Sequence, residues 1–544
     1  MVNSTLSVVI RSATTGILAV VSGSRSHLWL YQHDNLKSGS VFDILKEHNA
    51  DNAAYNSRER ELEHAFTCQE GTRRDVIAKI SAWSKVENGP PICWLRGPAG
   101  SGKSTVAHTI AAQCDHNQRL AFSFFFSRGK LDRSETTKFI PTFAYQLAKF
   151  FPAIQTSMQQ ALAHDPSILS QRLGDQIKKL IIYPVVIMTE PVAPMIVVID
   201  GLDECGEKDS LQELVRLLVD STNQCPFRFL FTSRPEPHIE RTFESPSTKC
   251  KAYFLSLSDF SATDDIRSYL RLHLSEIREK EPQLMRDVPK PWPSQRDLEI
   301  LVEQSEGLFI YVSTLVGFIG DGNGLPQNKL QVAMKVHKGV DPLYDHVLSE
   351  ARKYDNFEQV IGAIVYLRRP LTISELGWLL QLESSSIRLA LRGCQSIFTI
   401  PGVDSDSVRP YHASLRDFLT DGNRAKSHFL HPMKHHAFIL VDCLKSMAIN
   451  LENSGEGDVD LEYAHQNWCH HFSLALLHHG EMGVIESKLS DIEMFMRKLK
   501  KQWLKLWIYR LADFDTVSHV CEDFNSVLAK MMVCLMFSEF GSAY

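Results

Sequence analysis

Short apolar runs recur through the first half of the chain and are separated by more polar stretches. They occupy residues 92–95, 120–126, 195–199, 229–232 and 252–257. Runs of this length and composition are typical of strands buried on both faces of a parallel sheet. Helical periodicity appears between several of them, for example over residues 106–114 and 211–218. Strands that alternate with helices predict a wound α/β domain over residues 68–260.

Helices are expected to dominate residues 261–365. Ser261 and Asp264 have the spacing of a capping box and predict the start of a helix that runs through Leu274. Residues 298–365 continue the helical periodicity, with a loop predicted at 320–327. This part of the chain is therefore expected to form a helical subdomain.

Residues 366–425 follow a different order. Thr372 and Glu375 form a second capping-box pattern, and Ser385 is expected to begin another helix. Residues 396–400 and 408–411 predict a hairpin. Two helices, a hairpin and a final helix form the order of a winged-helix subdomain. Residues 371–420 hold four arginines against five acidic residues, so we expect an internal packing module and no nucleic-acid partner.

The two ends of the chain carry weaker patterns. Residues 1–67 are expected to form an N-terminal arm or a partial effector region, and residues 426–544 a C-terminal helical region without visible repeats. Within the latter, the stretch from Phe495 to Leu511 is basic and amphipathic. Such a helix can lie on an anionic membrane, but we favour a helix packed against its neighbours with a solvated lysine face.

Composition narrows the class of protein. The chain has 544 residues, of which 44% are hydrophobic and 22% charged, with a net charge of −6. No global positive field attracts nucleic acid or acidic lipid, and no apolar run approaches the ~18 residues that span a bilayer. The eleven cysteines include no C-x-x-C pair, which argues against a disulfide framework or a zinc ribbon. The sequence therefore predicts a multidomain cytoplasmic protein.

A phosphate-binding loop is the strongest chemical signal. The segment from Gly97 to Ser104 matches G-x-x-x-x-G-K-[ST] and lies between a predicted strand and a predicted helix. Its backbone N–H groups would cradle phosphates, Lys103 would reach the β- and γ-phosphates, and the Ser104 hydroxyl would bind Mg²⁺. The predicted nucleotide-binding residues are Gly97, Pro98, Ala99, Gly100, Ser101, Gly102, Lys103, Ser104 and Thr105.

Acidic residues follow the predicted strand at 195–199. Asp200, at the strand tip, is expected to hold Mg²⁺ together with Ser104. Asp203 or Glu204 is expected to orient and polarise the attacking water, since one carboxylate within reach suffices. Arg234, after the strand at 229–232, either senses the γ-phosphate and stabilises transition-state charge or is an ordinary surface cation.

Further segments extend the pattern beyond the phosphate-binding loop. Together they resemble a NACHT domain of the STAND class of P-loop NTPases, and the nephrocystin-type NACHT proteins of fungi most of all. The resemblance covers roughly residues 65–515. The residues that carry it are Cys68–Arg73, Trp83, Phe124–Arg128, Ile196–Cys205, Thr232–Pro235, Glu306–Tyr311, Pro342–Tyr344 and His412–Leu419.

This resemblance implies a nucleotide switch in signal transduction, of the fungal NLR-like kind that serves self/non-self recognition or cell death. Its members close a winged helix over bound ADP, and His412 would touch the β-phosphate. ATP would open the chain and favour a homo-oligomer that engages a protein partner, and Mg²⁺-dependent hydrolysis would be slow. ATP is the better guess and GTP the alternative. Such proteins usually carry WD40, ankyrin or TPR repeats, none of which is visible in this sequence. We therefore expect a truncated member, a product of gene modelling, or a stand-alone switch whose sensor lies on another chain.

Two other classes of function remain as alternatives. A metabolic P-loop kinase would need a lid and an acceptor pocket, whereas the sequence offers a winged helix and long helical segments. A scaffold that uses nucleotide only for structure is disfavoured by the intact Lys103, Ser104 and Asp200. A second metal site is not expected, because the histidine doublets, such as His435–His436 and His470–His471, point about 100° apart on a helix.

Overall fold

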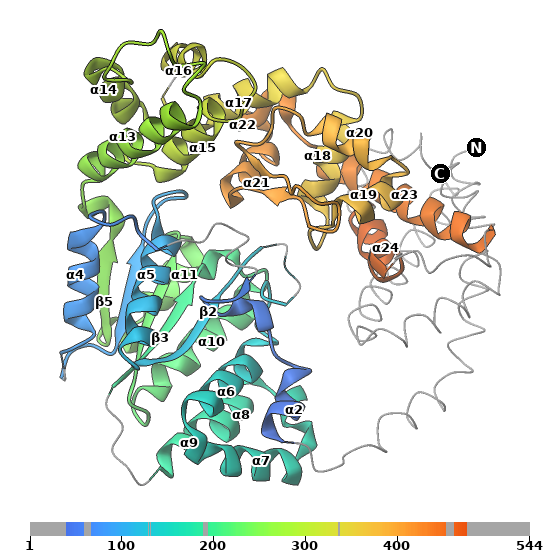
Figure 1. Cartoon of the computed structure of the whole chain (residues 1–544). Coiled ribbons are helices and arrows are strands. Elements are labelled where there is room, and N and C mark those ends of the chain that lie inside the picture. The colour runs from blue at the N-terminus through green and yellow to red at the C-terminus, as the bar shows by residue number, and fades with distance from the viewer. Residues whose placement is uncertain are drawn as a thin grey trace, which may run out of the picture. The chain divides into compact units, whose positions relative to one another are not determined.

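The computed structural model describes residues 40–58, 67–86, 88–128, 130, 132–188, 194–335, 338–452 and 462–475 (Figure 1). The chain divides into two compact units. The sheet unit contains Lys37–Tyr344 and Tyr411–Ser414, and the helical unit contains Asp345–Pro410 and the chain from Leu415. The stretch from Phe495 to Leu511 lies outside the described residues. Within the described ranges, no helix has both the length and the apolar character needed to cross a membrane.

Five parallel strands form the central sheet of the sheet unit. Their order is β2-β3-β4-β1-β5. This confirms the five predicted strands, with ends that shift by no more than two residues. The strands are β1 Ile92–Arg96, β2 Leu120–Phe125, β3 Met195–Asp200, β4 Phe227–Ser233 and β5 Ala252–Ser256.

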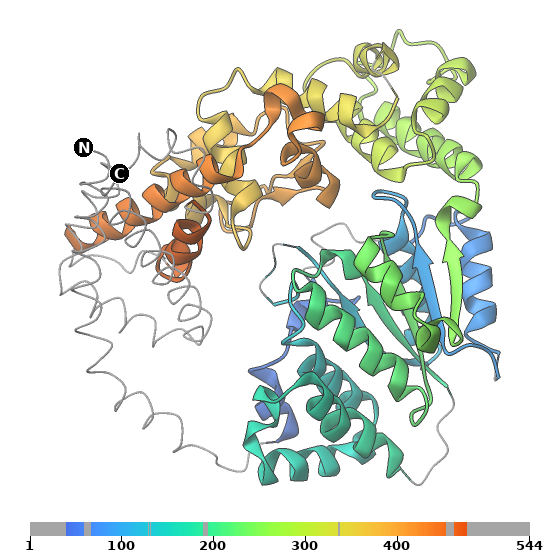
Figure 2. The same cartoon turned by 180° about the vertical axis from the view of Figure 1, so that it is seen from behind.

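Helices cover both faces of this sheet (Figure 1). One face packs against α4 and α5, and the other against α6, α10 and α11, with α10 brought forward in the reversed view of Figure 2. The helices are α2 Val41–Lys46, α4 Arg74–Trp83, α5 Lys103–His116, α6 Phe139–Phe150, α7 Gln155–His164, α8 Leu173–Ile177, α9 Tyr183–Val186, α10 Lys208–Ser221, α11 Pro237–Phe243 and α12 Pro246–Lys249.

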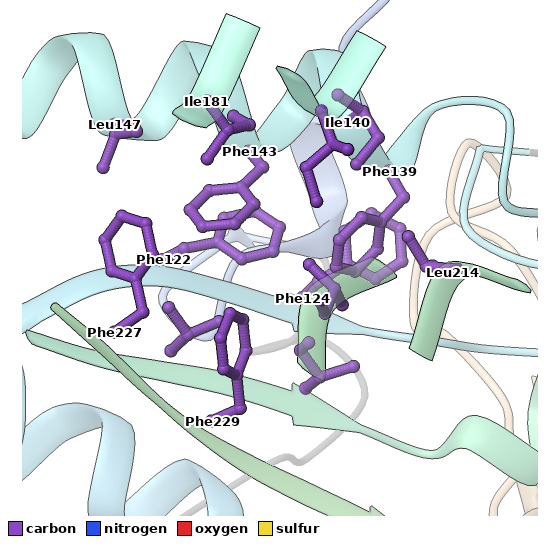
Figure 3. Packing of buried hydrophobic residues seen from close by; sticks show 14 of the residues in the cluster. Phe122, Phe124, Phe139, Ile140, Phe143, Leu147, Ile181, Leu214, Phe227 and Phe229 are labelled. Carbon is purple, nitrogen blue, oxygen red and sulfur yellow. The ribbon is translucent and has the colours of Figure 1, made fainter. Parts of the chain in front are cut away.

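Phenylalanines fill the larger of the two cores (Figure 3). Phe122 from β2 stacks on Phe143 from α6, with ring centroids 4.4 Å apart, and Phe139 meets Phe122 edge-on. Val41 and Leu45 of α2 are buried in the same core. Part of the segment that the sequence assigned to an N-terminal arm is thus packed against α6, where the Ala50 N–H donates to Thr142 Oγ1 at 2.9 Å.

The predicted helical subdomain follows β5. Its helices are α13 Thr263–Lys280, α14 Gln295–Gln304, α15 Phe309–Ile319, α16 Pro326–Lys335 and α17 Val340–Ala351. The helix predicted through Leu274 is therefore confirmed, but its capping box is wrong. Ala262 is the N-cap, and Ser261 Oγ accepts only the Thr263 N–H, at 3.4 Å. The helix begins too late for Asp264 to occupy the third helical position.

The helical unit contains the predicted winged-helix order. The Thr372–Glu375 capping box is confirmed, because Thr372 Oγ1 accepts the Glu375 N–H at 3.0 Å and Glu375 Oε2 accepts the Thr372 N–H at 2.7 Å. The hairpin is also present, although it is shorter than predicted. The elements are α18 Phe357–Tyr366, α19 Ile373–Leu380, α20 Ser384–Ala390, β6 Phe398–Thr399, β7 Arg409–Pro410, α21 Ala413–Leu419, α22 Gly422–Ala425, α23 Pro432–Glu452 and α24 Glu462–Ala475.

A buried chain of hydrogen bonds links α23 to α24. The Arg368 N–H donates to the Tyr463 hydroxyl, which lies 2.8 Å from His471 Nε2. His471 Nδ1 in turn lies 2.8 Å from His436 Nδ1. Both ring nitrogens of His471 thus lie within hydrogen-bond distance of a partner, and burial, which lowers the pKa of His436 and of His471, keeps both rings neutral.

We expect this region to weaken in mild acid. Burial lowers the pKa of His435 and of His436 to about 4, and that of His471 well below the ordinary value. Unfolded histidine titrates near 6.5, so the unfolded state binds more protons between about pH 6.5 and 4. Each histidine then removes about 1.4 kcal/mol of stability per pH unit as the pH falls through that window.

Hydrogen exchange of the α23 and α24 amides measures this effect. Exchange should accelerate between pH 7 and pH 5 beyond the intrinsic pH dependence of exchange. The pH dependence should shrink in His436→Gln and stay unchanged in His164→Gln, an exposed control on α7. Equal corrected protection at the two pH values would contradict the neutral-histidine assignment.

Candidate functional site

The phosphate-binding loop connects β1 to α5. Gly100 and Gly102 have φ values of +71° and +92°, in the left-handed region that favours glycine. A Cβ at Gly100 would lie 2.0 Å from Ile310 Cγ2 of α15, and Gly102 is the N-cap of α5. The loop thus ends at the N-terminus of a 14-residue helix, whose exposed N–H groups and dipole favour a phosphate.

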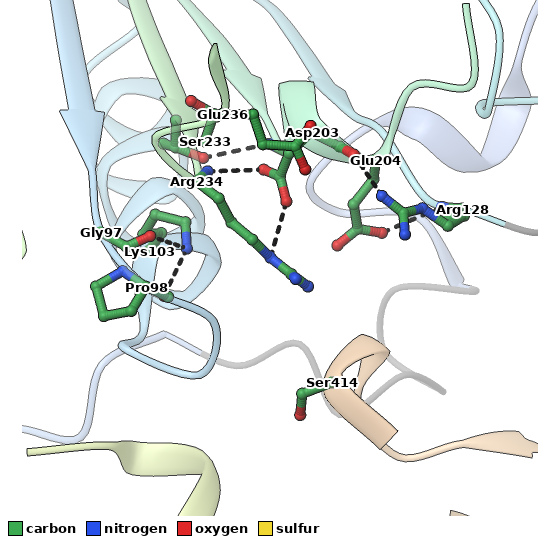
Figure 4. A network of polar contacts seen from close by, with 12 residues as sticks. Gly97, Pro98, Lys103, Arg128, Asp203, Glu204, Ser233, Arg234, Glu236 and Ser414 are labelled. Carbon is green, nitrogen blue, oxygen red and sulfur yellow. Dashed lines mark hydrogen bonds and ion pairs between the residues drawn. The ribbon is translucent and has the colours of Figure 1, made fainter. Parts of the chain in front are cut away.

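Lys103 folds back over this loop. Its Nζ donates to the carbonyl oxygens of Gly97 and Pro98, both at 2.9 Å, and its side chain is buried (Figure 4). Burial lowers the pKa of Lys103, while the negative charges of Asp203 and Asp200 oppose that shift. The Lys103 amine is therefore fixed at the loop, where Asp203 and Asp200 stabilise its positive charge. Of the other predicted residues, Ser101 Oγ binds the Pro98 carbonyl, Ser104 is exposed, and Ala99 and Thr105 are partly buried.

Strand β4 lies between β1 and β3, so three strand ends meet at one edge of the sheet. Asp200, the last residue of β3, is buried and accepts a hydrogen bond from Thr232 of β4. The Gly201 N–H donates to the Thr232 carbonyl at 3.1 Å. A carboxylate at this tip and the exposed Ser104 hydroxyl offer the hard oxygen ligands that Mg²⁺ prefers, so the donor chemistry fits the predicted metal site.

Asp203 and Arg234 form an ion pair across the β3 and β4 ends (Figure 4). Asp203 Oδ2 lies 3.0 Å from Arg234 Nε, and Asp203 Oδ1 accepts the Arg234 N–H at 2.9 Å. Both carboxylate oxygens are thus engaged by one residue. The ion pair directs the Arg234 side chain along the edge of the site. The Arg234 side chain is mostly buried, unlike that of a solvated surface cation.

Glu204 has different partners from its neighbour. Its Oε2 accepts the Arg128 N–H at 3.1 Å, and Arg128 Nη2 donates to the Asp203 carbonyl at 2.8 Å. Burial, with the nearby charge of Asp203, raises the pKa of Glu204 to about 7. A carboxyl group with such a pKa exchanges protons readily near neutrality, which is the property of a general base or acid.

The sequence did not predict individual roles for two arginines at the site, Arg73 and Arg128. Arg73 is buried and donates from Nη2 to the Ser101 carbonyl at 2.7 Å. Its Cζ lies 5.0 Å from the centroid of the Phe309 ring. Arg128 contacts the acidic turn, which we define as residues 200–207 at the end of β3. The only signal for either was membership in the family-like segments 68–73 and 124–128, because their partners are distant in sequence.

His412 is oriented by its own turn. Its Nδ1 accepts the Ser414 N–H at 3.1 Å and lies 2.8 Å from Ser414 Oγ, which in turn lies 2.9 Å from the Tyr344 hydroxyl. Ser414 therefore holds the His412 ring in place from its Nδ1 side. Ser414 is labelled in Figure 4.

One family comparison covers this site. Residues 67–234 match the family model described as Nephrocystin 3, N-terminal. The matched range includes the phosphate-binding loop and the acidic turn and ends at Arg234. No curated protein sequence gives a match.

Solved structures offer more distant likenesses. A STAND protein with a tetratricopeptide repeat sensor from Pyrococcus horikoshii is 11% identical with a TM-score of 0.38, over 86% of this chain and 66% of that one. The present chain thus spans just under two thirds of that protein. The Aeropyrum pernix ORC1 protein, solved with DNA, is 12% identical over 71% of this chain and 98% of its own, with a TM-score of 0.30. Cdc6p from Pyrobaculum aerophilum is 14% identical over 64% and 93%, also with a TM-score of 0.30. Likenesses this remote say nothing about substrate or partner.

Proposed function

We propose that this chain, whose residues 67–234 match the nephrocystin 3 N-terminal family model, is a NACHT-type P-loop NTPase of the STAND class and works as a nucleotide-operated switch. It binds ADP in a closed state and ATP in an open state that forms homo-oligomers. We extend the proposal to cytoplasmic signalling of the fungal NLR-like kind, with a protein partner for sensing or output. Support for this last step comes from the sequence motifs.

The observation that carries the proposal is the meeting of three groups at one sheet edge. Lys103 leaves the loop after β1, Asp200 ends β3, and the strand between them delivers Arg234. One phosphate chain laid on the N-terminus of α5 would meet a cation, a metal-binding carboxylate and a second cation. That set serves phosphoryl transfer.

Each residue then has a defined task. Lys103 exchanges the Gly97 and Pro98 carbonyls for phosphate oxygens, while Ser104 and Asp200 hold Mg²⁺, which neutralises phosphate charge when bound. Asp203 keeps Arg234 aimed along the edge, where a guanidinium can meet the γ-phosphate. Glu204, whose carboxylate is not taken up by an ion pair with Arg234, accepts the proton of the attacking water.

His412 is proposed to report on ADP. In the proposed closed state Nε2 donates to a β-phosphate oxygen, and a hydrogen bond to a charged group contributes about 1.5–3 kcal/mol. His412→Ala should therefore weaken ADP binding by about 10- to 150-fold, while triphosphate binding through Lys103 persists. Titration calorimetry with both nucleotides measures this, with His116→Ala on the exposed end of α5 as the control. Unchanged ADP affinity would make His412 a purely structural residue.

The switch itself is tested on the purified full chain. The nucleotide released by denaturation should be a diphosphate, and size-exclusion chromatography with light scattering should show a larger particle after exchange into a non-hydrolysable ATP analogue. Parallel exchange into a GTP analogue tests base preference. Fast multiple turnover with no change of particle size would instead favour a metabolic enzyme.

A further inference from the structure

The segment after β2 holds the acidic turn at several points. The Phe126 N–H donates to the Asp200 carbonyl at 2.9 Å, and the Gly206 N–H donates to the Ser134 carbonyl at 2.8 Å. Thr136 donates to Glu207 Oε2 from its N–H at 3.1 Å and from its hydroxyl at 2.8 Å. Arg128 also contacts this turn. We call the four contacting residues, Phe126, Arg128, Ser134 and Thr136, the clasp.

Arg128 makes the two clasp contacts that reach the candidate catalytic residues. Its backbone N–H binds the Glu204 carboxylate, and its guanidinium binds the Asp203 carbonyl (Figure 4). The carbonyl of Asp203 belongs to the peptide that precedes Glu204. The guanidinium therefore fixes the peptide plane from which the Glu204 side chain extends, and its positive charge lies beside that carboxylate.

We propose that Arg128 is a positioning residue for nucleotide hydrolysis, which holds the Glu204 carboxylate in place through the Asp203 carbonyl and does not itself bind nucleotide. This inference rests on the proposed role of Glu204 as general base. The backbone N–H and the guanidinium of Arg128 both bind the turn that carries Glu204. Turnover should therefore depend on Arg128, whereas nucleotide affinity should not.

Three substitutions separate the two properties of this side chain. Arg128→Ala removes both the hydrogen bond to Asp203 and the charge. Arg128→Gln keeps an amide donor and loses the charge, and Arg128→Lys keeps the charge without the planar fork. We expect kcat to fall about tenfold in Arg128→Ala, a part of what a general base supplies, with both single-property variants in between. The Kd for nucleotide should stay within about twofold.

Arg119→Ala is the matched control. Arg119 lies at the other end of β2, where it donates to the Ser84 carbonyl at 2.7 Å and the Pro194 carbonyl at 3.3 Å. Its loss removes comparable hydrogen bonds from the same strand without touching the acidic turn. The kcat of this variant should equal that of the wild type, even where its thermal stability falls.

The pH profile adds a readout that a purely structural role would not move. The charged groups around Glu204 are Asp203, Asp200, Arg128 and Lys103, with Arg234 paired to Asp203. Of these, Arg128 favours the ionised form of Glu204. Loss of its charge in Arg128→Gln should shift the rise of kcat/KM to higher pH by about half a unit or more, whereas Arg128→Lys should not shift it.

A double variant decides between the outcomes. If Arg128 acts through Glu204, Arg128→Ala should cost little additional turnover in a Glu204→Gln background. Full additivity, or wild-type kcat in Arg128→Ala, would overturn the inference. So would a large loss of nucleotide affinity, because Arg128 would then be a nucleotide ligand. Wild-type turnover in Glu204→Gln alone would instead remove the proposed general base and leave the positioning role without a target.

Discussion

Lys103→Ala should abolish nucleotide binding while the chain remains folded. The amine supplies the charge that meets the β- and γ-phosphates, and each hydrogen bond between charged groups contributes about 1.5–3 kcal/mol. Loss of two such contacts should weaken binding by at least about 100-fold. In the structure Nζ is buried against the Gly97 and Pro98 carbonyls, and burial of a charged amine is costly. Its removal should therefore change the free energy of unfolding only slightly.

Titration calorimetry and thermal unfolding test this together. Nucleotide should raise the melting temperature of the wild type and leave that of Lys103→Ala unchanged, because only a bound ligand stabilises the native state. Lys149→Ala, an exposed lysine on α6, should behave as the wild type. Lys103→Arg should also bind poorly, since the guanidinium is wider than the ammonium. Equal affinity in Lys103→Ala and the wild type would contradict the phosphate-binding role.

The sequence could predict the sheet because buried parallel strands leave a simple trace. The runs at 195–199 and 229–232 are almost entirely apolar, and the structure buries both faces of β3 and β4. The order of the strands in the sheet could not be predicted from these apolar runs. Placement of β4 between β1 and β3 is a long-range property, and it brings Arg234 to the acids.

Local patterns were informative only where geometry follows directly from spacing. The capping box at Thr372 is present, whereas that at Ser261 is not, because the helix starts at Thr263 and Ala262 takes the N-cap position. Two similar patterns at the same spacing, Thr372 with Glu375 and Ser261 with Asp264, thus gave different outcomes. The spacing does not say at which residue the helix begins, and a start at Thr263 places Asp264 at the second helical position.

The candidate site shows a similar limit. Asp203 and Glu204 are adjacent in sequence, so spacing alone could not assign their roles. In the structure Asp203 forms an ion pair with Arg234, and Glu204 accepts a hydrogen bond from the Arg128 N–H. Arg128 lies 76 residues before Glu204, and the contact exists because β2 pairs with β3. Partners set by strand pairing cannot be found from spacing within a motif.

These different partners predict different effects for the two acids. Glu204→Gln should bind Mg²⁺-nucleotide as the wild type does but hydrolyse it at least about tenfold more slowly, the low end of the loss expected for a general base. Asp203→Asn should weaken triphosphate binding as well, because the ion pair that aims Arg234 is lost.

The pH dependence gives the sharpest test of Glu204. A general base must be deprotonated, and the pKa of Glu204 is about 7, so kcat/KM of the wild type should rise between pH 6 and 8 with a midpoint near 7. The profile should be flat over that range in Glu204→Gln, because glutamine does not titrate. Glu213→Gln, an exposed residue on α10, should keep both the wild-type rate and the wild-type profile. A slow Asp203→Asn beside a fully active Glu204→Gln would transfer the role of general base to Asp203, and its pairing with Arg234 would then have to open before each turnover.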